Sequence, residues 1–200
     1  MMRLLDIDLD ALVANCHGST EGAQRVVGDD VEWARAMLGA PAASRWFMDE
    51  HRYAYDVWQK RGVRSAEVWH FDAHHDCYGA TDHRIWRMSA RQGGVMPDCV
   101  TSATYLLAAW RRRMIQHIYW VLPSWLSTDF AAKALRREMG PAWRYLDIVP
   151  ASQVPSESWD IATVCWSRRW IDERYHEDVV GCIPPDVAMA VNRGEDVVPF

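Results

Sequence analysis

The feature that most constrains this chain is a period-two alternation near its start. Residues 4–13, LLDIDLDALV, alternate apolar side chains with Asp6, Asp8 and Asp10. Such alternation is typical of a β-strand, because successive side chains of a strand point to opposite faces. Three carboxylates on one face of a strand flanked by leucine and valine would be costly to bury without partners. That face is therefore a candidate functional surface.

The rest of the chain alternates between helical and extended patterns. Helices are expected over 29–60, with a break at Gly39–Pro41 and an end at Gly62, and over 100–113 and 127–138. Strands are expected over 66–73, 116–122, 145–149 and 160–166, and an irregular tail from about Gly181. Strands that alternate with helices predict an α/β fold, with a mostly parallel sheet flanked by helices. We expect residues 1–200 to form a single domain.

Composition argues against several classes of function. The formal net charge of −5 gives no basic surface for nucleic acid. No apolar run is long enough to span a bilayer, and the start of the chain lacks the pattern of a signal peptide. Five cysteines without a CxxC pair argue against a disulfide framework or a thiolate zinc site. We therefore expect a cytoplasmic protein without nucleic-acid or membrane partners; the sequence does not predict its oligomeric state.

A second aspartate-rich segment follows the strand expected at 66–73. In FDAHHD, residues 71–76, the side chains of Asp72, His74 and Asp76 project together if the backbone is extended. Two carboxylates and an imidazole at the end of a strand form half of a metal site. A solvated surface turn is the alternative interpretation.

Asp8 and Asp10 supply the other half by the same spacing. One divalent ion does not need five carboxylates, whereas two ions about 3.5–4 Å apart would neutralise them and could share a bridging carboxylate. Oxygen donors with one or two imidazoles favour Mn²⁺ over zinc, with Fe²⁺ and Co²⁺ as alternatives. The sequence therefore predicts two ions per chain.

These segments resemble a known superfamily. DAHHD resembles the DAHxD signature of the ureohydrolases (arginase and agmatinase), and IDLD resembles their second signature, DxD. The context is closer to a compact, divergent branch that includes peptide arginases, which convert arginine residues of ribosomally made peptides to ornithine. That branch shares an N-terminal DIDLD strand, a Glu-His pair on a helix (here Glu50–His51) and a V-P-x-W segment (here 121–125). The resemblance spans roughly residues 4–170.

The resemblance implies a ligand set. The implied metal ligands are Asp8, Asp10, His51, Asp72, His74 and Asp76. Asp72 would bridge both ions, His51 and Asp76 would bind the first, and His74 the second. Asp6 would stand behind the ligands without binding an ion, although a register with Asp6 and Asp8 as the DxD pair remains open.

The chain also departs from ordinary arginases. Its DxD segment precedes DAHxD, whereas in ordinary arginases it follows, so an arginase-like sheet would need an altered strand order. The glutamate that arginases use for the guanidinium has no clear match after the strand expected at 160–166.

The activity that the resemblance implies is hydrolysis of a guanidino group. A hydroxide bridging two Mn²⁺ ions would attack the guanidino carbon of an arginine residue in a ribosomally made peptide, releasing urea and leaving ornithine. His75 or His83 would carry the proton to the leaving amine. Among the carboxylates that could bind the guanidinium, Glu50 ranks first as a catalytic and substrate-binding residue. The other options are Asp49, Asp82 and Asp98.

Two alternative functions belong to other classes. LLDIDLDALV also resembles the opening of haloacid-dehalogenase-like, Mg²⁺-dependent phosphatases, but these need a later lysine, for which only Lys133 is plausible, and a further acidic pair. The chain could also be a non-catalytic module in which the acids and histidines hold a structural ion and the twelve tryptophans form a peptide groove.

Overall fold

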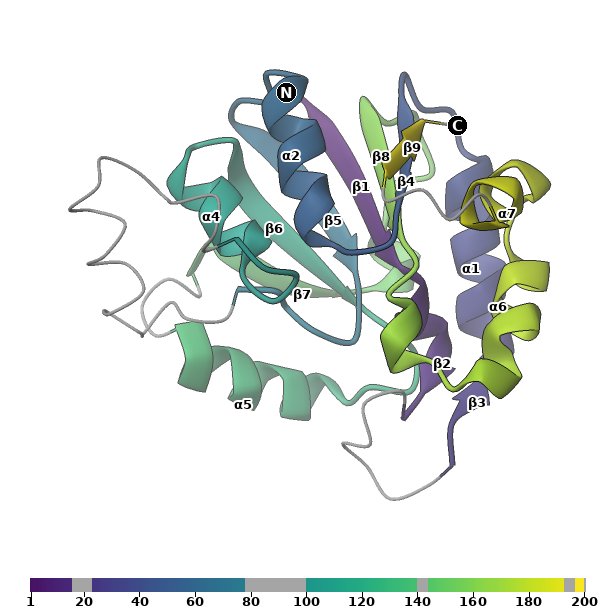
Figure 1. Ribbon diagram of the computed structural model, residues 1–200. Coiled ribbons are helices and arrows are strands. Elements are labelled where there is room, and N and C mark those ends of the chain that lie inside the picture. The colour runs from purple at the N-terminus through teal and green to yellow at the C-terminus, as the bar shows by residue number, and fades with distance from the viewer. Residues whose placement is uncertain (16–22, 78–99, 140–143, 193–196, 200) are drawn as a thin grey trace.

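The protein is built on one mixed sheet with helices on both faces (Figure 1). The structure, a computed structural model, describes residues 1–15, 23–77, 100–139, 144–192 and 197–199. In the described part of the chain the main sheet has seven strands. In sheet order they are β7 (Leu146–Pro150), β6 (Ile115–Leu122), β5 (Ala66–Phe71), β1 (Arg3–Asp8), β8 (Ile161–Cys165), β4 (Arg45–Met48) and β9 (Val197–Pro199). Six of them run parallel, and β9 pairs antiparallel with β4.

The helices form a layer on each face of this sheet. One layer contains α2 (Arg52–Lys60), α4 (Tyr105–Arg111) and α5 (Thr128–Met139), and the other contains α1 (Gly28–Gly39), α6 (His176–Cys182) and α7 (Pro185–Asn192). A short 3₁₀ turn, η1 (Leu9–Leu12), follows β1, and β2 (Val13–Ala14) pairs with β3 (Arg25–Val26) beside it. None of the helices in the described residues combines the length and the apolar character that crossing a membrane requires.

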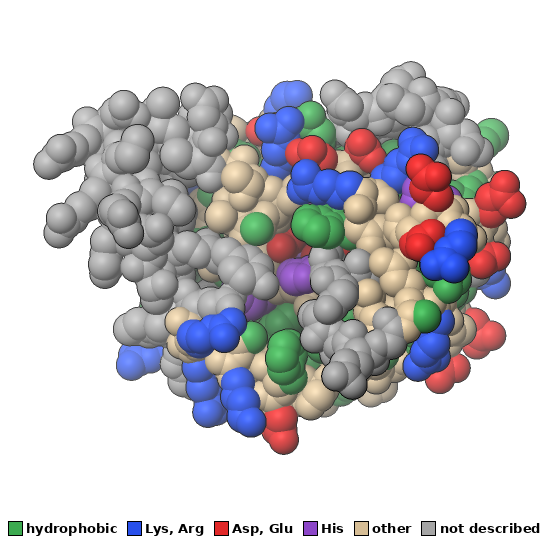
Figure 2. Space-filling view, turned by 60° about the horizontal axis from the view of Figure 1, so that its bottom comes forward, with side chains coloured by type: hydrophobic (Ala, Val, Ile, Leu, Met, Phe, Trp, Pro, Cys, Tyr) green, Lys and Arg blue, Asp and Glu red, His purple; other side chains and the backbone are tan. Residues whose placement is uncertain are grey.

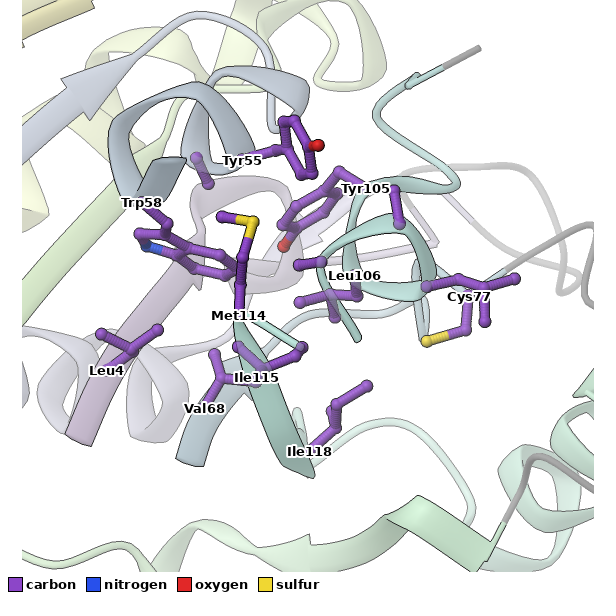
Figure 3. Packing of buried hydrophobic residues seen from close by; sticks show 14 of the residues in the cluster. Leu4, Tyr55, Trp58, Val68, Cys77, Tyr105, Leu106, Met114, Ile115 and Ile118 are labelled. Atoms are coloured by element: carbon purple, nitrogen blue, oxygen red, sulfur yellow. The ribbon is translucent and has the colours of Figure 1, made fainter. Parts of the chain in front are cut away.

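The sheet is buried on both faces, as parallel sheets generally are. On β1, Leu4 points into the cluster under α2 and α4, where it lies with Trp58 and Tyr105 (Figure 3). Leu5 and Ile7 point into the opposite cluster, under α1. The alternation read from the sequence therefore separates two cores, and the two aspartates of β1, Asp6 and Asp8, lie on the same face as Leu4.

This architecture confirms the α/β class and the mostly parallel sheet flanked by helices. Several local expectations are wrong. The strand expected at 4–13 ends at Asp8, and Leu9–Leu12 form η1, so Asp10 lies in a 3₁₀ turn rather than on the strand. The segment at 45–48 is a strand rather than part of a helix over 29–60, because Phe47 and Met48 alternate between the two cores as β4 pairs with β8. The tail beyond Gly181 is not irregular throughout, because Pro185 begins α7; a proline suits the first turn of a helix.

The expected end of α2 at Gly62 is confirmed. Gly62 has φ +69°, its N–H donates to Gln59 O at 3.1 Å, and the Val63 N–H donates to Trp58 O at 3.0 Å. These two bonds form a Schellman motif. Val63 is fully buried in the same cluster as Trp58, so the motif also sets the path of the chain into β5.

Replacing Gly62 tests this turn. No atom lies within 4 Å of the position that a Cβ would take, so the cost of Gly62→Ala is conformational rather than steric. We expect it to lower the free energy of unfolding by about 1 kcal/mol, because a left-handed backbone disfavours a side chain. Gly181→Ala, equally uncrowded but inside α6, is the matched control and should raise stability by a few tenths to about 1 kcal/mol. Chemical denaturation measures both, and equal effects would contradict the account.

Candidate metal centre

The site is built from rows of side chains that cross the three central strands. In the first row, Leu4 of β1 pairs with Val68 of β5 and Ile161 of β8, all of them apolar. Two residues further along each strand, on the same face, the row becomes polar. It consists of His70, Asp6 and Thr163, which occupy paired positions.

The next row lies at the carboxyl ends of these strands and is the most acidic. Asp8 ends β1 and pairs with Cys165 of β8, while Asp72 follows β5 directly. Because functional groups of parallel sheets collect beyond the carboxyl ends of the strands, this row is where a site is expected. Along one face of these strands, the side chains therefore change from apolar to polar to acidic toward the carboxyl ends.

All six ligands that the resemblance implies line one pocket of about 320 Å³ at this end of the sheet. They are Asp8, Asp10, His51, Asp72, His74 and Asp76. Five of them are at least 95% buried, whereas the His74 side chain is 28% exposed. In Figure 2, which brings the carboxyl ends of the strands forward, histidine and acidic side chains lie near the middle of the face. Asp6 does not line the pocket and lies beneath it, so the structure places Asp8 and Asp10, rather than Asp6 and Asp8, at the pocket.

His51 stands at the N-terminus of α2, above the row of aspartates. Its Nδ1 lies 3.1 Å from Asp8 Oδ2, 3.2 Å from Asp76 Oδ2 and 3.4 Å from Asp72 Oδ2. Although the ring is 1% exposed, neither of its nitrogens has a hydrogen bond of acceptable geometry. Ligands about 2.1 Å from a common ion lie about 3.0–3.4 Å from one another. An unsatisfied buried imidazole with three carboxylates at this spacing fits a divalent metal ion.

Two groups of three ligands share one residue. His51, Asp72 and Asp76 bring their ligand atoms within 4.8 Å of one another, and so do Asp8, Asp10 and Asp72. A carboxylate has two oxygens, so Asp72 can serve both groups. A further group contains Asp8, His51 and Cys165, and another contains Asp6, His51 and His70. Asp72 is therefore common to two of these four groups.

The buried carboxylates strongly perturb one another. Burial and the neighbouring charges of Asp8 and Asp72 raise the pKa of Asp10 well above its usual value. Burial and Asp72 raise the pKa of Asp76 to about 6. Burial also acts to raise the pKa of Asp72, but the close His51 and His74 imidazoles outweigh it and hold that pKa well below the usual range. Asp72 is therefore the carboxylate that the surroundings stabilise most in its charged form.

Two tryptophans hold the backbone that carries these ligands. Trp120 Nε1 donates to Asp72 O at 2.9 Å, and Trp125 Nε1 donates to Ala11 O at 2.9 Å. Trp120 lies in β6, and Trp125 lies in the segment that follows it, which is the V-P-x-W segment noted in the sequence. Part of the high tryptophan content therefore supports the two ligand-bearing segments.

The expected catalytic residues, unlike the expected metal ligands, do not all line the metal pocket. The ring of His75 packs edge-on against Trp120, and its Nδ1 accepts the Cys77 N–H at 3.1 Å, so His75 does not line the pocket. His83, Asp82 and Asp98 lie outside the described residues. These three roles remain predictions.

Glu50 lies beside the metal pocket, in an adjoining pocket of about 430 Å³ that also contains Asp49. The two pockets share Ser102, Ser167 and Arg169. The Glu50 carboxylate contacts Arg52 Nε at 3.0 Å and comes within 4.0 Å of Arg169 Nη1. Its exposed position allows a role in substrate binding, which also remains a prediction.

Sequence reasoning missed several residues that line or surround the pocket. His70 continues the spacing of Asp72, His74 and Asp76 backwards by two residues, so the pattern H-x-D-x-H-x-D was visible in the sequence. Tyr105, Thr163 and Ser167 carried no such signal, because only the fold brings them to the aspartates. Ser167 Oγ donates to Asp8 Oδ2 at 2.6 Å.

Comparison of the chain with protein-family models, with curated proteins and with solved structures found no match.

Ser167 offers a test of how the site is supported. It is a non-glycine residue with a left-handed backbone, φ 42° and ψ 38°, directly after β8. Ser167→Gly and Ser167→Ala both remove the hydroxyl that holds Asp8, so we expect both to weaken Mn²⁺ binding about equally. Only the glycine variant relieves the backbone, so it should be more stable than the alanine variant by about 1 kcal/mol. Calorimetric titration and thermal unfolding measure the two effects, and unchanged Mn²⁺ affinity in both variants would contradict the role of the hydroxyl.

Proposed function

We propose that this protein is a two-metal hydrolase that converts arginine residues of a ribosomally made peptide to ornithine, with release of urea. The observation that carries the proposal is the convergence of all six implied ligands on one pocket, in two groups that share Asp72. The reaction is the one that the ureohydrolase resemblance implies, and the shared pocket of the implied ligands supports it. An arginase-like sheet with an altered strand order is part of the same proposal.

The ligand set assigns a position to each ion. His51, Asp72 and Asp76 would hold the first ion, and Asp8, Asp10 and Asp72 the second. His74 lines the same pocket, and its Nδ1 lies 3.2 Å from Asp72 Oδ1, so it is placed to complete the second set.

Oxygen donors with imidazole favour Mn²⁺. Two such ions would polarise the guanidino group and make water available as a nucleophile at neutral pH. Among the described residues that line the pocket, the His74 side chain is 28% exposed, which suits a catalytic rather than a purely structural metal site.

The surroundings of the pocket support a guanidinium on a larger molecule. Glu50 presents a partly exposed carboxylate at the rim, and a guanidinium binds a carboxylate in bidentate geometry. The guanidinium of Arg169 lies 4.0 Å from the same carboxylate. The adjoining pocket leaves room for the chain on either side of a substrate arginine.

Loading the metal-free protein with Mn²⁺ tests the proposal. We expect about two ions per chain by metal analysis, and conversion of arginine to ornithine in an Arg-containing peptide by mass spectrometry, with urea formed in equal amount. Asp72→Asn should lose metal and abolish conversion, because the shared carboxylate disappears.

The matched control for this experiment is His117→Ala. His117 Nε2 lies 2.9 Å from Asp147 Oδ2, so this is also a His–Asp pair. Neither residue lines the metal pocket. This variant should keep both metal and activity. Bound metal without urea from either peptide or free arginine would refute the proposed reaction. Mg²⁺-dependent hydrolysis of an aryl phosphate would instead favour the phosphatase.

A further inference from the structure

A second layer of polar side chains lies directly beneath the metal pocket. It consists of Asp6, His70, Tyr105 and Thr163, each of them fully buried. None of these four lines the pocket. Burying four polar side chains costs free energy unless each finds a partner. Their hydrogen bonds therefore show what this layer holds in place.

Asp6 is the centre of this layer. Its Oδ1 accepts a hydrogen bond from the Thr163 hydroxyl, and its Oδ2 accepts one from the Tyr105 hydroxyl. His70 Nδ1 lies 3.0 Å from the same Oδ2. Three donors from three different elements therefore surround this carboxylate and fix it to the protein. Asp6 is accordingly a fixed point on β1 to which other groups are tied.

His70 connects this fixed point to the metal-binding segment. Its Nδ1 faces Asp6 Oδ2, and its Nε2 lies 3.1 Å from the backbone oxygen of His74. A backbone carbonyl can only accept, so the Nε2–H of His70 donates to the His74 carbonyl. A nitrogen that carries this proton has no lone pair for a metal ion.

The turn that His70 reaches also has hydrogen bonds of its own, because the His74 N–H donates to Asp72 Oδ1 at 2.8 Å and the Cys77 N–H to His75 Nδ1 at 3.1 Å. After β5 the backbone leaves the sheet, and Asp76 adopts a left-handed conformation with φ 44°. Trp120 holds the carbonyl of Asp72, and His70 holds the carbonyl of His74. These two bonds anchor the turn that presents both ligands to the pocket. The bond from His70 to the His74 carbonyl therefore acts on the ligand that we assign to the second ion.

We propose that His70 is a positioning residue that fixes the backbone at His74 and thereby preorganises the second metal position. This inference rests on the proposed function only in so far as the pocket binds divalent ions. Residues that orient metal ligands through hydrogen bonds typically contribute 10–100-fold to metal affinity. Loss of the His74 anchor should therefore weaken the second ion by about 10–100-fold and leave the first ion bound.

Two conservative variants separate the two hydrogen bonds of His70. The amide nitrogen of His70→Gln can reach the position of Nε2 and still donate to the His74 carbonyl. That of His70→Asn can reach only the position of Nδ1 and bonds Asp6 alone. Tyr105→Phe is the control, because it removes one donor from Asp6 but keeps the ring against His51 and the bond from His70 to His74.

The experiment is a calorimetric Mn²⁺ titration of the four proteins, with thermal unfolding of each metal-free form. We expect two ions in the unaltered protein and in Tyr105→Phe, with similar affinities. His70→Asn should bind the second ion about 10–100-fold more weakly, and His70→Gln should lie close to the unaltered protein. A merely structural role would instead make affinity follow thermal stability in all three variants.

Several results would overturn the inference. These are an unchanged second affinity in His70→Asn, an equal loss in Tyr105→Phe, or selective loss of the first ion, which would make His70 a ligand. Absence of any bound ion in the unaltered protein would overturn both this inference and the proposed function. Two bound ions without conversion of arginine would refute the proposed reaction alone, and the order of the affinities would still decide the role of His70.

Discussion

The structure depends on how it compensates a concentration of negative charge in its interior. Five aspartates and three histidines meet at the carboxyl ends of β1 and β5: Asp6, Asp8, Asp10, Asp72 and Asp76, with His51, His70 and His74. Two like charges about 4 Å apart repel by about 4 kcal/mol at the effective dielectric constant of a protein. A few uncompensated pairs would therefore consume the 5–15 kcal/mol by which a typical domain is stable. Either positive charge or protonation of some carboxylates, such as Asp10 and Asp76 with their raised pKa values, must therefore offset this repulsion.

Imidazoles and metal ions compensate this charge in different ways. The pKa of His74 is lowered by burial, but the Asp72 carboxylate outweighs burial and raises it to about 9. The histidines can therefore carry protons in the metal-free protein. Divalent ions would displace protons from the imidazoles that become ligands, while the bond from His70 to the His74 carbonyl would stay in place. On the proposed function, an upper layer would exchange protons for metal and a lower layer would keep its hydrogen bonds.

The acidic and histidine residues that line the pocket were visible in the sequence, because strand periodicity and strand ends are local properties. The alternation around Asp6 and Asp8 indicated the face of β1, and FDAHHD marked the end of β5. What could not be predicted depends on the neighbours of each segment. β4 is a strand only because β8 and β9 flank it, whereas its aromatic spacing alone resembled a helix. Tyr105 reaches Asp6 across 99 residues, which no local pattern announces.

The central claim is that Asp72 lies between two ligand groups that hold two ions. Anomalous diffraction from Mn²⁺-soaked crystals tests it most directly, because it locates each ion without reference to activity. The account predicts two peaks about 3.5–4 Å apart, with one oxygen of the Asp72 carboxylate toward each. A single peak, or a pair of peaks that Asp72 does not join, would contradict it.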